Sequence, residues 1–310
     1  MRQFANILTG VDLSRGDRFV NDSLSPPNAE AVRRAIWLAK LNSAKLTFFA
    51  SLEMSPQAQH RIETEGDLEK SLLSQAEAAL DGLVQQAAES GVTATKKVVF
   101  GKAWLQLIRQ VLRDHHDVVL VGTHHSNDYR GLLFGSTGLK LLRKCPCPVW
   151  VLRAESVDEH GPILVAHDLR DVGDLAMKLG AGLAELEKAR LHVVHSLEEI
   201  QQTNDILPSG GSAVQVEQCK QNALEHIEQQ LDGISLPAPA EIHLTTDAPD
   251  FAILESIETY GIQLVVMGTL GRGGIPGLLI GNTAERLLPR IPCSVLAVKP
   301  NDFVSPVTLE

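Results

Sequence analysis

The chain has 310 residues, 44% of them hydrophobic, and a formal net charge of −10 at pH 7. This length is sufficient for two domains that each bury a core of their own. The acidic balance argues against nucleic acid as a partner, because proteins usually bind it through a basic face.

No apolar run approaches the roughly 20 residues of a membrane span, and the N-terminus lacks the pattern of a signal peptide. The cysteines do not form the disulfide framework of a small secreted protein. Cys145-Pro146-Cys147 has one intervening residue where redox and zinc motifs usually have two or more. The sequence therefore predicts a cytoplasmic protein with reduced thiols.

The first half alternates apolar runs with segments of helical periodicity. The predicted strands cover residues 4–12, 46–52, 95–100, 118–121 and 149–152. The predicted helices include residues 32–39, 72–87, 104–112 and 136–144. This βαβαβαβαβ order is typical of a parallel sheet that is covered by helices on both faces.

The same order starts again after a polar segment at 154–161. Strands are expected at residues 163–166, 191–197, 242–246, 264–267 and 295–298. Helices are expected at residues 175–186, 216–231 and 253–257, with a fourth that begins after residue 282. A flexible loop is expected at 201–212, and the tail from residue 300 to 310 is expected to be disordered.

Two similar loops indicate that the halves are copies of one unit. Residues 131–137 (GLLFGST) correspond to residues 277–283 (GLLIGNT), 146 positions further along the chain. Asp12 corresponds to Asp168 at an offset of 156. The first copy thus carries about ten extra residues, which we place in its 14–27 loop.

We predict an α/β protein of two tandem doubly wound domains, each with a five-stranded parallel sheet. The domains cover residues 1–153 and 161–300, and a tail follows at 301–310. Ligands of such sheets bind beyond the carboxyl ends of the strands, where the strand order reverses. Asp12 and Gly122 lie at such ends and are candidates for one site, as Asp168 is in the second copy.

The second half carries a glycine loop with the spacing G-x2-G-x9-G-x-T, formed by Gly268, Gly271, Gly281 and Thr283. Asn282 is expected to be the N-cap of the following helix. A helix start beside glycines suits a phosphate, although the same glycines could serve only tight turns and Asn282 only as a cap. The spacing matches neither a P-loop nor a dinucleotide fingerprint.

This loop, the aspartate after the first strand of each half, the strand order and the repeat together resemble the universal stress protein family in its two-repeat form. The family pattern, G-x2-G-x9-G-[ST], implies a site for ATP or for AMP or ADP, with or without Mg²⁺. Carried over by position, the resemblance implies these nucleotide-binding residues: Ala166, Asp168, Ser196, Gly268, Gly271, Arg272, Gly281, Asn282 and Thr283.

The resemblance implies a role for most of these residues. Asp168 holds the adenine or ribose end, and the backbone near Ser196 lies beside the base. Gly268, Gly271 and Arg272 wrap the phosphates and the ribose, and residues 281–283 bind the phosphates. Asn282 stands where the family has Ser or Thr, and its amide can donate a hydrogen bond as a hydroxyl does.

The first half departs further from the family pattern, because His125 replaces the second glycine. Its side chain would point into the volume that the nucleotide needs, so we expect a degenerate site there. The resemblance also implies that the last strands of the two halves, 149–152 and 295–298, pair to form an intramolecular pseudo-dimer, with further homo-oligomers left open.

We expect a stress-response regulator that binds an adenine nucleotide and acts on a protein partner that the sequence does not identify. The alternatives are a nucleotide-free structural or chaperone-like stress factor, and an enzyme that slowly hydrolyses ATP or transfers adenylyl groups. We expect no catalytic residues, because no nucleophile with an adjacent base is evident. We also expect no metal site, because the histidines, His192 and His243 among them, form no H-E-x-x-H pattern.

Overall fold

The structure is a computed structural model that describes residues 4–14, 20, 23–53, 66–123, 134–154, 161–198, 212–269 and 281–309. The chain divides into two compact units. Unit 1 comprises Met1–Ala154 and Val304–Glu310, and unit 2 comprises Glu155–Phe303. The loop predicted at 201–212 lies, apart from Ser212, outside the described residues.

Unit 1 contains a parallel sheet with the strand order β3-β2-β1-β4-β5. Its strands are β1 (Asn6–Gly10), β2 (Lys45–Leu52), β3 (Ala94–Phe100), β4 (Val118–Gly122) and β5 (Val149–Leu152). Its helices are α1 (Pro26–Asn42), α3 (Gly66–Glu89), α4 (Ala103–Asp114) and α5 (Gly135–Lys144).

Unit 2 repeats this arrangement with the order β8-β7-β6-β9-β10, again parallel. Its strands are β6 (Ile163–Ala166), β7 (Leu191–Ser196), β8 (Glu241–Thr245), β9 (Leu264–Gly268) and β10 (Ser294–Val298). Its helices are α6 (Asp171–Glu187), α8 (Ser212–Leu231), α9 (Pro249–Tyr260) and α10 (Asn282–Leu287). The predicted α/β class with doubly wound parallel sheets is confirmed.

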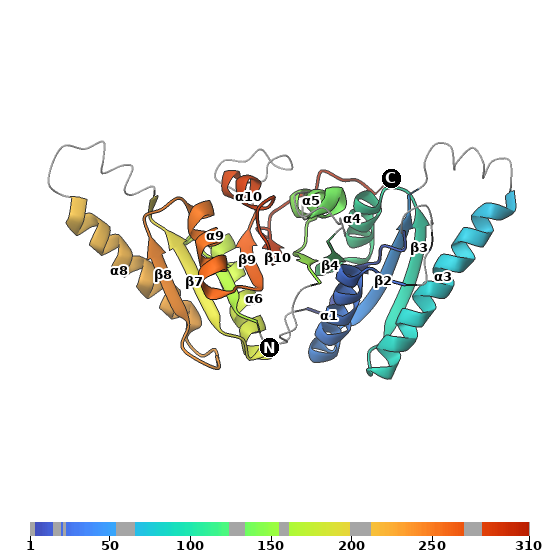
Figure 1. Cartoon of the computed structure of the whole chain (residues 1–310), viewed down its shortest axis with the longest axis horizontal. Coiled ribbons are helices and arrows are strands. Elements are labelled where there is room, and N and C mark those ends of the chain that lie inside the picture. Colours follow the sequence, from blue (N-terminus) through green and yellow to red (C-terminus); the bar gives the residue numbers. More distant parts are fainter. Residues whose placement is uncertain are drawn as a thin grey trace. The chain divides into compact units, whose positions relative to one another are not determined.

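The central strands are apolar along their length because the sheet is covered on both faces. Leu164 and Val165 of β6 point to opposite faces and are both fully buried, as are Val265 and Val266 of β9. Helix α6 contacts β6 and β9, and α9 contacts β6 and β7 (Figure 1). Each such side chain contributes about 1.5–3 kcal/mol to folding when it is removed from water.

The C-terminal tail was predicted to be disordered, and this prediction is wrong for residues 300–309. The hydroxyl of Ser305 donates to the carbonyl oxygen of Lys144 at 2.8 Å, and Arg109 Nε donates to the carbonyl oxygen of Thr308 at 3.1 Å. The tail is thereby attached to α4 and α5 of unit 1. The sequence could not predict this attachment, because both hydrogen bonds join the tail to helix residues that are distant in the chain.

Within the described residues, no helix combines the length and the apolar character that crossing a bilayer requires. The four cysteines, Cys145, Cys147, Cys219 and Cys293, are thiols.

Candidate functional site

The carboxyl edge of the unit 2 sheet brings together the ends of strands that are distant in the chain. β6 is paired with β7 on one side and with β9 on the other, and its last residue, Ala166, lies opposite Val194 and Met267. From β6 the chain proceeds outward through β7 and β8, and then returns to the other side for β9 and β10. The strand order therefore reverses between β6 and β9, which is where doubly wound sheets bind ligands.

Asp168 follows β6 at this edge, and its side chain is exposed. Its Oδ1 accepts the backbone N–H of Arg170 at 3.2 Å. Gly173 is required beside it, because a Cβ there would lie only 2.5 Å from Asp168 Oδ1. The carboxylate thus stabilises its own turn, and it is also exposed to solvent at this edge of the sheet.

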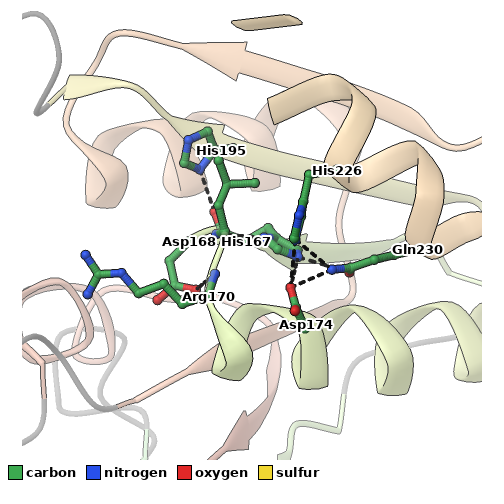
Figure 2. Close-up of polar contacts among 8 residues, drawn as sticks. His167, Asp168, Arg170, Asp174, His195, His226 and Gln230 are labelled. Carbon is green, nitrogen blue, oxygen red and sulfur yellow. Dashed lines mark hydrogen bonds and ion pairs between the residues drawn. The ribbon is translucent and has the colours of Figure 1, made fainter. Parts of the chain in front are cut away.

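The turn after β6 is held by a second local hydrogen bond. Leu169 has a φ of 56°, which is costly for a residue with a branched side chain. Its N–H donates to His167 Nδ1 at 2.9 Å, and His195 Nδ1 donates to the carbonyl oxygen of His167 at 2.8 Å (Figure 2). These contacts fix the backbone that presents Asp168.

Ser196 is the last residue of β7. Its hydroxyl donates to the carbonyl oxygen of Asp247 and accepts the N–H of Glu198 at 3.2 Å. The side chain is therefore used to shape the strand end, which leaves the backbone as the part of this residue that a ligand could contact.

The two ends of the glycine motif, Gly268 and Gly281, are both attached to the end of β9. A Cβ on Gly268 would lie 2.6 Å from Val172 Cγ1, so this glycine allows α6 to approach the strand. At the other end of the loop, the N–H of Gly281 donates to the carbonyl oxygen of Thr269 at 2.8 Å. The first and third glycines of the motif are thus held at the same strand end. Gly271 and Arg272 lie outside the described residues.

Asn282 was predicted to be the N-cap of the next helix, and this prediction is wrong. Gly281 is the N-cap, with extended φ and ψ of −61° and 148°, and no side chain donates or accepts a cap hydrogen bond. The N–H of Glu285 closes the first turn on the carbonyl oxygen of Gly281 at 2.9 Å. Asn282 is consequently the first helical residue, with an exposed side chain, and Thr283 is half-buried.

Sequence reasoning missed a buried cation beside the loop. Lys299 follows β10, is 3% exposed, and donates from Nζ to Oγ1 of the fully buried Thr269. Its ammonium also lies 5.1 Å from the ring centroid of Phe303. Through Thr269, the ammonium group of this buried lysine lies at the end of β9. Its position directly after an apolar strand was the available signal.

A polar cluster lies behind the Asp168 turn and is formed by His167, Asp174, His226 and Gln230 (Figure 2). Asp174 Oδ1 accepts from His226 Nε2 at 2.9 Å and from the Gln230 amide, whose Oε1 lies 3.1 Å from His167 Nε2. Burial raises the pKa of Asp174, but the hydrogen bonds from His226 and Gln230 outweigh it, and the pKa lies below the usual value. Burial lowers the pKa of His167. The hydrogen bonds of Asp174 to His226 and Gln230 thus join α6 to α8.

The corresponding edge of unit 1 contains a cavity of about 320 Å³. It is lined by residues from the ends of β1, β2 and β4 and from the start of α5, among them Asp12, Leu13, Phe49, Gly122, Ser136 and Thr137. Asp12 Oδ1 accepts the N–H of Ser14 at 2.9 Å and also its hydroxyl. His125, which belongs to the loop after β4, lies outside the described residues.

Comparison with known proteins shows which proteins the whole chain resembles. The model of the universal stress protein family matches residues 5–153 and again residues 160–299. "Universal stress protein E" of Photorhabdus laumondii is 25% identical over 324 residues, which cover 99% of this chain and 98% of the relative.

Solved structures show the same fold over nearly the full length. A functionally unknown protein from Pseudomonas aeruginosa PAO1 covers 97% of this chain and 95% of its own, with a TM-score of 0.71 and 22% identity. A universal stress protein from Archaeoglobus fulgidus covers 96% of this chain and 99% of its own, with a TM-score of 0.68 and 18% identity.

Proposed function

The chain belongs to the universal stress protein family, with two copies of the family's domain in tandem, and from this premise we propose that unit 2 binds an adenine nucleotide at the carboxyl edge of its sheet. The nucleotide is ATP, or AMP or ADP, with or without Mg²⁺. In this proposal the protein is a cytoplasmic stress-response regulator, and its nucleotide-bound state alters the surface that a protein partner recognises.

One observation carries the proposal. The third glycine of the loop, Gly281, is tied by its N–H to the carbonyl oxygen of Thr269, directly after β9, and Asp168 stands across the switch point after β6. The two ends of a nucleotide need different chemistry. A carboxylate accepts from ribose hydroxyls or an adenine amine, whereas backbone N–H groups donate to phosphate oxygens. The switch point has one kind of group on each side.

The proposal assigns the remaining residues to these two ends. Ala166 and the backbone at Ser196 would lie along the base, and Gly268, Gly271 and Arg272 would wrap the phosphates and the ribose. Asn282 and Thr283 would donate to phosphate oxygens. Lys299 would offset phosphate charge from its position at Thr269.

The proposed role is binding rather than turnover. Among the described residues of this edge, the Ser196 hydroxyl is directed at a backbone carbonyl and not at a histidine or carboxylate that could act as its base. We therefore expect any hydrolysis of ATP to be slow.

A second candidate function has its own support in unit 1. The cavity of about 320 Å³ lies at the equivalent strand ends, and its size is at the lower limit for small-molecule sites. Apolar side chains such as Phe49 and polar groups such as Ser136 line it together. This observation favours a protein with two ligand sites rather than one.

The test is isothermal titration of the full chain with ATP, ADP and AMP, each with Mg²⁺ and with EDTA, and with GTP as the control for the base. One equivalent of an adenine nucleotide, with GTP much weaker, supports the proposal. Two equivalents support the second candidate. Absence of binding by all three adenine nucleotides would reject nucleotide recognition and favour a ligand-free stress factor, while rapid Mg²⁺-dependent turnover would favour an enzyme.

A further inference from the structure

Three ionisable side chains converge on one face of the unit 2 sheet, away from its carboxyl edge. His192 is the second residue of β7, and Glu241 and His243 lie at the start of β8. His192 is paired with Glu241 in the register of the two parallel strands. Glu241 and His243 share a face because alternate residues of a strand point the same way.

The possible ligand atoms of these residues lie near one another, at distances close to or somewhat longer than those of a metal site. His192 Nδ1 lies 3.2 Å from His243 Nε2 and 3.8 Å from Glu241 Oε2. All three atoms lie within 4.8 Å of one another. In a tetrahedral zinc site with bonds of roughly 2.0–2.1 Å, ligand atoms are about 3.3 Å apart. The strand register therefore places the three donors close to a coordinating arrangement.

Tyr260, the last residue of α9, completes the surroundings of the two imidazoles. Its ring stacks on His192 at 4.7 Å and on His243 at 4.5 Å between centroids. Its hydroxyl lies 3.4 Å from His243 Nδ1. When Nδ1–H donates to this oxygen, His243 Nε2 carries the lone pair, which is the tautomer that a metal requires.

Both rings are poised to be neutral. Burial lowers the pKa of His192, and the neighbouring His243 and Arg190 act in the same direction against the opposing effect of Glu241. Burial also lowers the pKa of His243, again against Glu241. His192 Nδ1 and His243 Nε2 share one hydrogen bond, so an ion bound between them would replace that bond, and its proton would move to the other nitrogen of the same ring. Glu241 is exposed, which gives an ion access from solvent.

We propose that His192, Glu241 and His243 bind a divalent transition-metal ion of the zinc class, with the remaining coordination position open to water. Two imidazoles and one carboxylate suit Zn²⁺, Cu²⁺ or Ni²⁺ better than Mg²⁺ or Ca²⁺, which prefer oxygen ligands. Bound there, the ion would join β7 to β8.

A second group of possible ligands consists of His167, Asp174 and His226, whose ligand atoms also lie within 4.8 Å of one another. This group fits a metal less well. His167 Nδ1 accepts the N–H of Leu169, so the neutral ring carries its proton on Nε2. That nitrogen is the one facing Asp174, at 3.4 Å. To coordinate a metal through Nε2, the ring would have to move its proton to Nδ1. Nδ1 could then no longer accept the hydrogen bond that holds the Leu169 turn.

This difference between the clusters provides the control. The full chain, freed of metal with a chelator that is then removed, is titrated with Zn²⁺ alone by calorimetry. We expect one tight equivalent. His243→Gln and Glu241→Gln should each weaken it more than about 100-fold, and Tyr260→Phe about tenfold, the lower limit for loss of a group that orients a ligand. The matched control His226→Gln should leave it unchanged.

Co²⁺ supplies a second readout. Its visible spectrum should show nitrogen and oxygen ligation without the intense thiolate charge-transfer bands that binding at the cysteines would give. Because Glu241 is exposed, Glu241→Gln separates lost coordination from lost folding, which circular dichroism checks. No tight equivalent in the parent chain, thiolate bands, or a loss in His226→Gln that His243→Gln does not share would each overturn the proposal.

Discussion

The N–H of Gly281 donates to the carbonyl oxygen of Thr269 across 2.8 Å, and this contact closes the glycine loop of unit 2 onto the end of β9. It places the third glycine of the motif next to the first. Lys299 joins the same strand end, because its Nζ donates to Thr269 Oγ1.

This contact can be removed by a substitution that keeps the φ of residue 281, although the proline ring also pushes the carbonyl oxygen of Thr269 away. Gly281 has a φ of −61°, which proline also adopts. Gly281→Pro removes the N–H, whereas Gly281→Ala keeps it. We expect Gly281→Pro to bind adenine nucleotide at least about tenfold more weakly than Gly281→Ala, since the lost hydrogen bond alone is equivalent to roughly 1–1.5 kcal/mol. Equal affinities by calorimetry would show that this closure is irrelevant to binding.

The second glycine of the motif can be tested with the residue that the first half carries in its place. Gly271→His should abolish nucleotide binding, because a side chain would enter the volume of the phosphates. Circular dichroism and the urea midpoint should be unchanged. The reciprocal His125→Gly tests whether the cavity of unit 1 gains a ligand. Unaltered affinity in Gly271→His would remove the loop from the account.

Buried histidine should make stability depend on pH. The pKa of His167 lies below 6.5 in the folded chain because of its burial. The unfolded chain therefore binds the proton first as pH falls, so the stabilisation is complete above pH 6.5 and is lost as pH falls toward the folded-state pKa. We expect the free energy of unfolding to decrease from pH 7.5 to 5.5, and His167→Gln to reduce that slope by at most about 1.4 kcal/mol per pH unit. Identical slopes in urea titrations would contradict this.

The tail should contribute to the stability of unit 1. Ser305→Ala removes the hydrogen bond to Lys144, at a cost of about 1 kcal/mol. Deletion of residues 304–310 also removes the contact of Thr308 with Arg109 and should cost more. Urea unfolding measures both. A deletion variant as stable as the full chain would show that the tail is only loosely associated.

The sequence predicted the strands and their order well, because a covered parallel sheet leaves apolar runs such as Val118–Val121 and Leu264–Met267. It also placed the extra residues of the first copy. The loop after β1 runs from residue 11 to 25, whereas the loop after β6 runs only from 167 to 170. A change in the numbering offset between corresponding residues of the two copies shows where such an insertion lies.

What the sequence could not predict depends on register and on contacts between distant segments. His192 and His243 are 51 residues apart and meet only because β7 and β8 pair. The cap residue was misplaced by one position, because Asn is usually the better cap and Gly281 takes the role through its backbone alone. The burial of Lys299 depends on Thr269 and Phe303, which no local pattern connects.

The measurement that tests the central claim most directly is to denature the purified full chain and identify the released small molecules by chromatography and mass spectrometry, in parallel with Gly271→His. The account predicts about one equivalent of an adenine nucleotide from the parent chain and none from the variant. Equal amounts of nucleotide from both chains, or a parent chain that releases none and binds none when ATP is added, would contradict it.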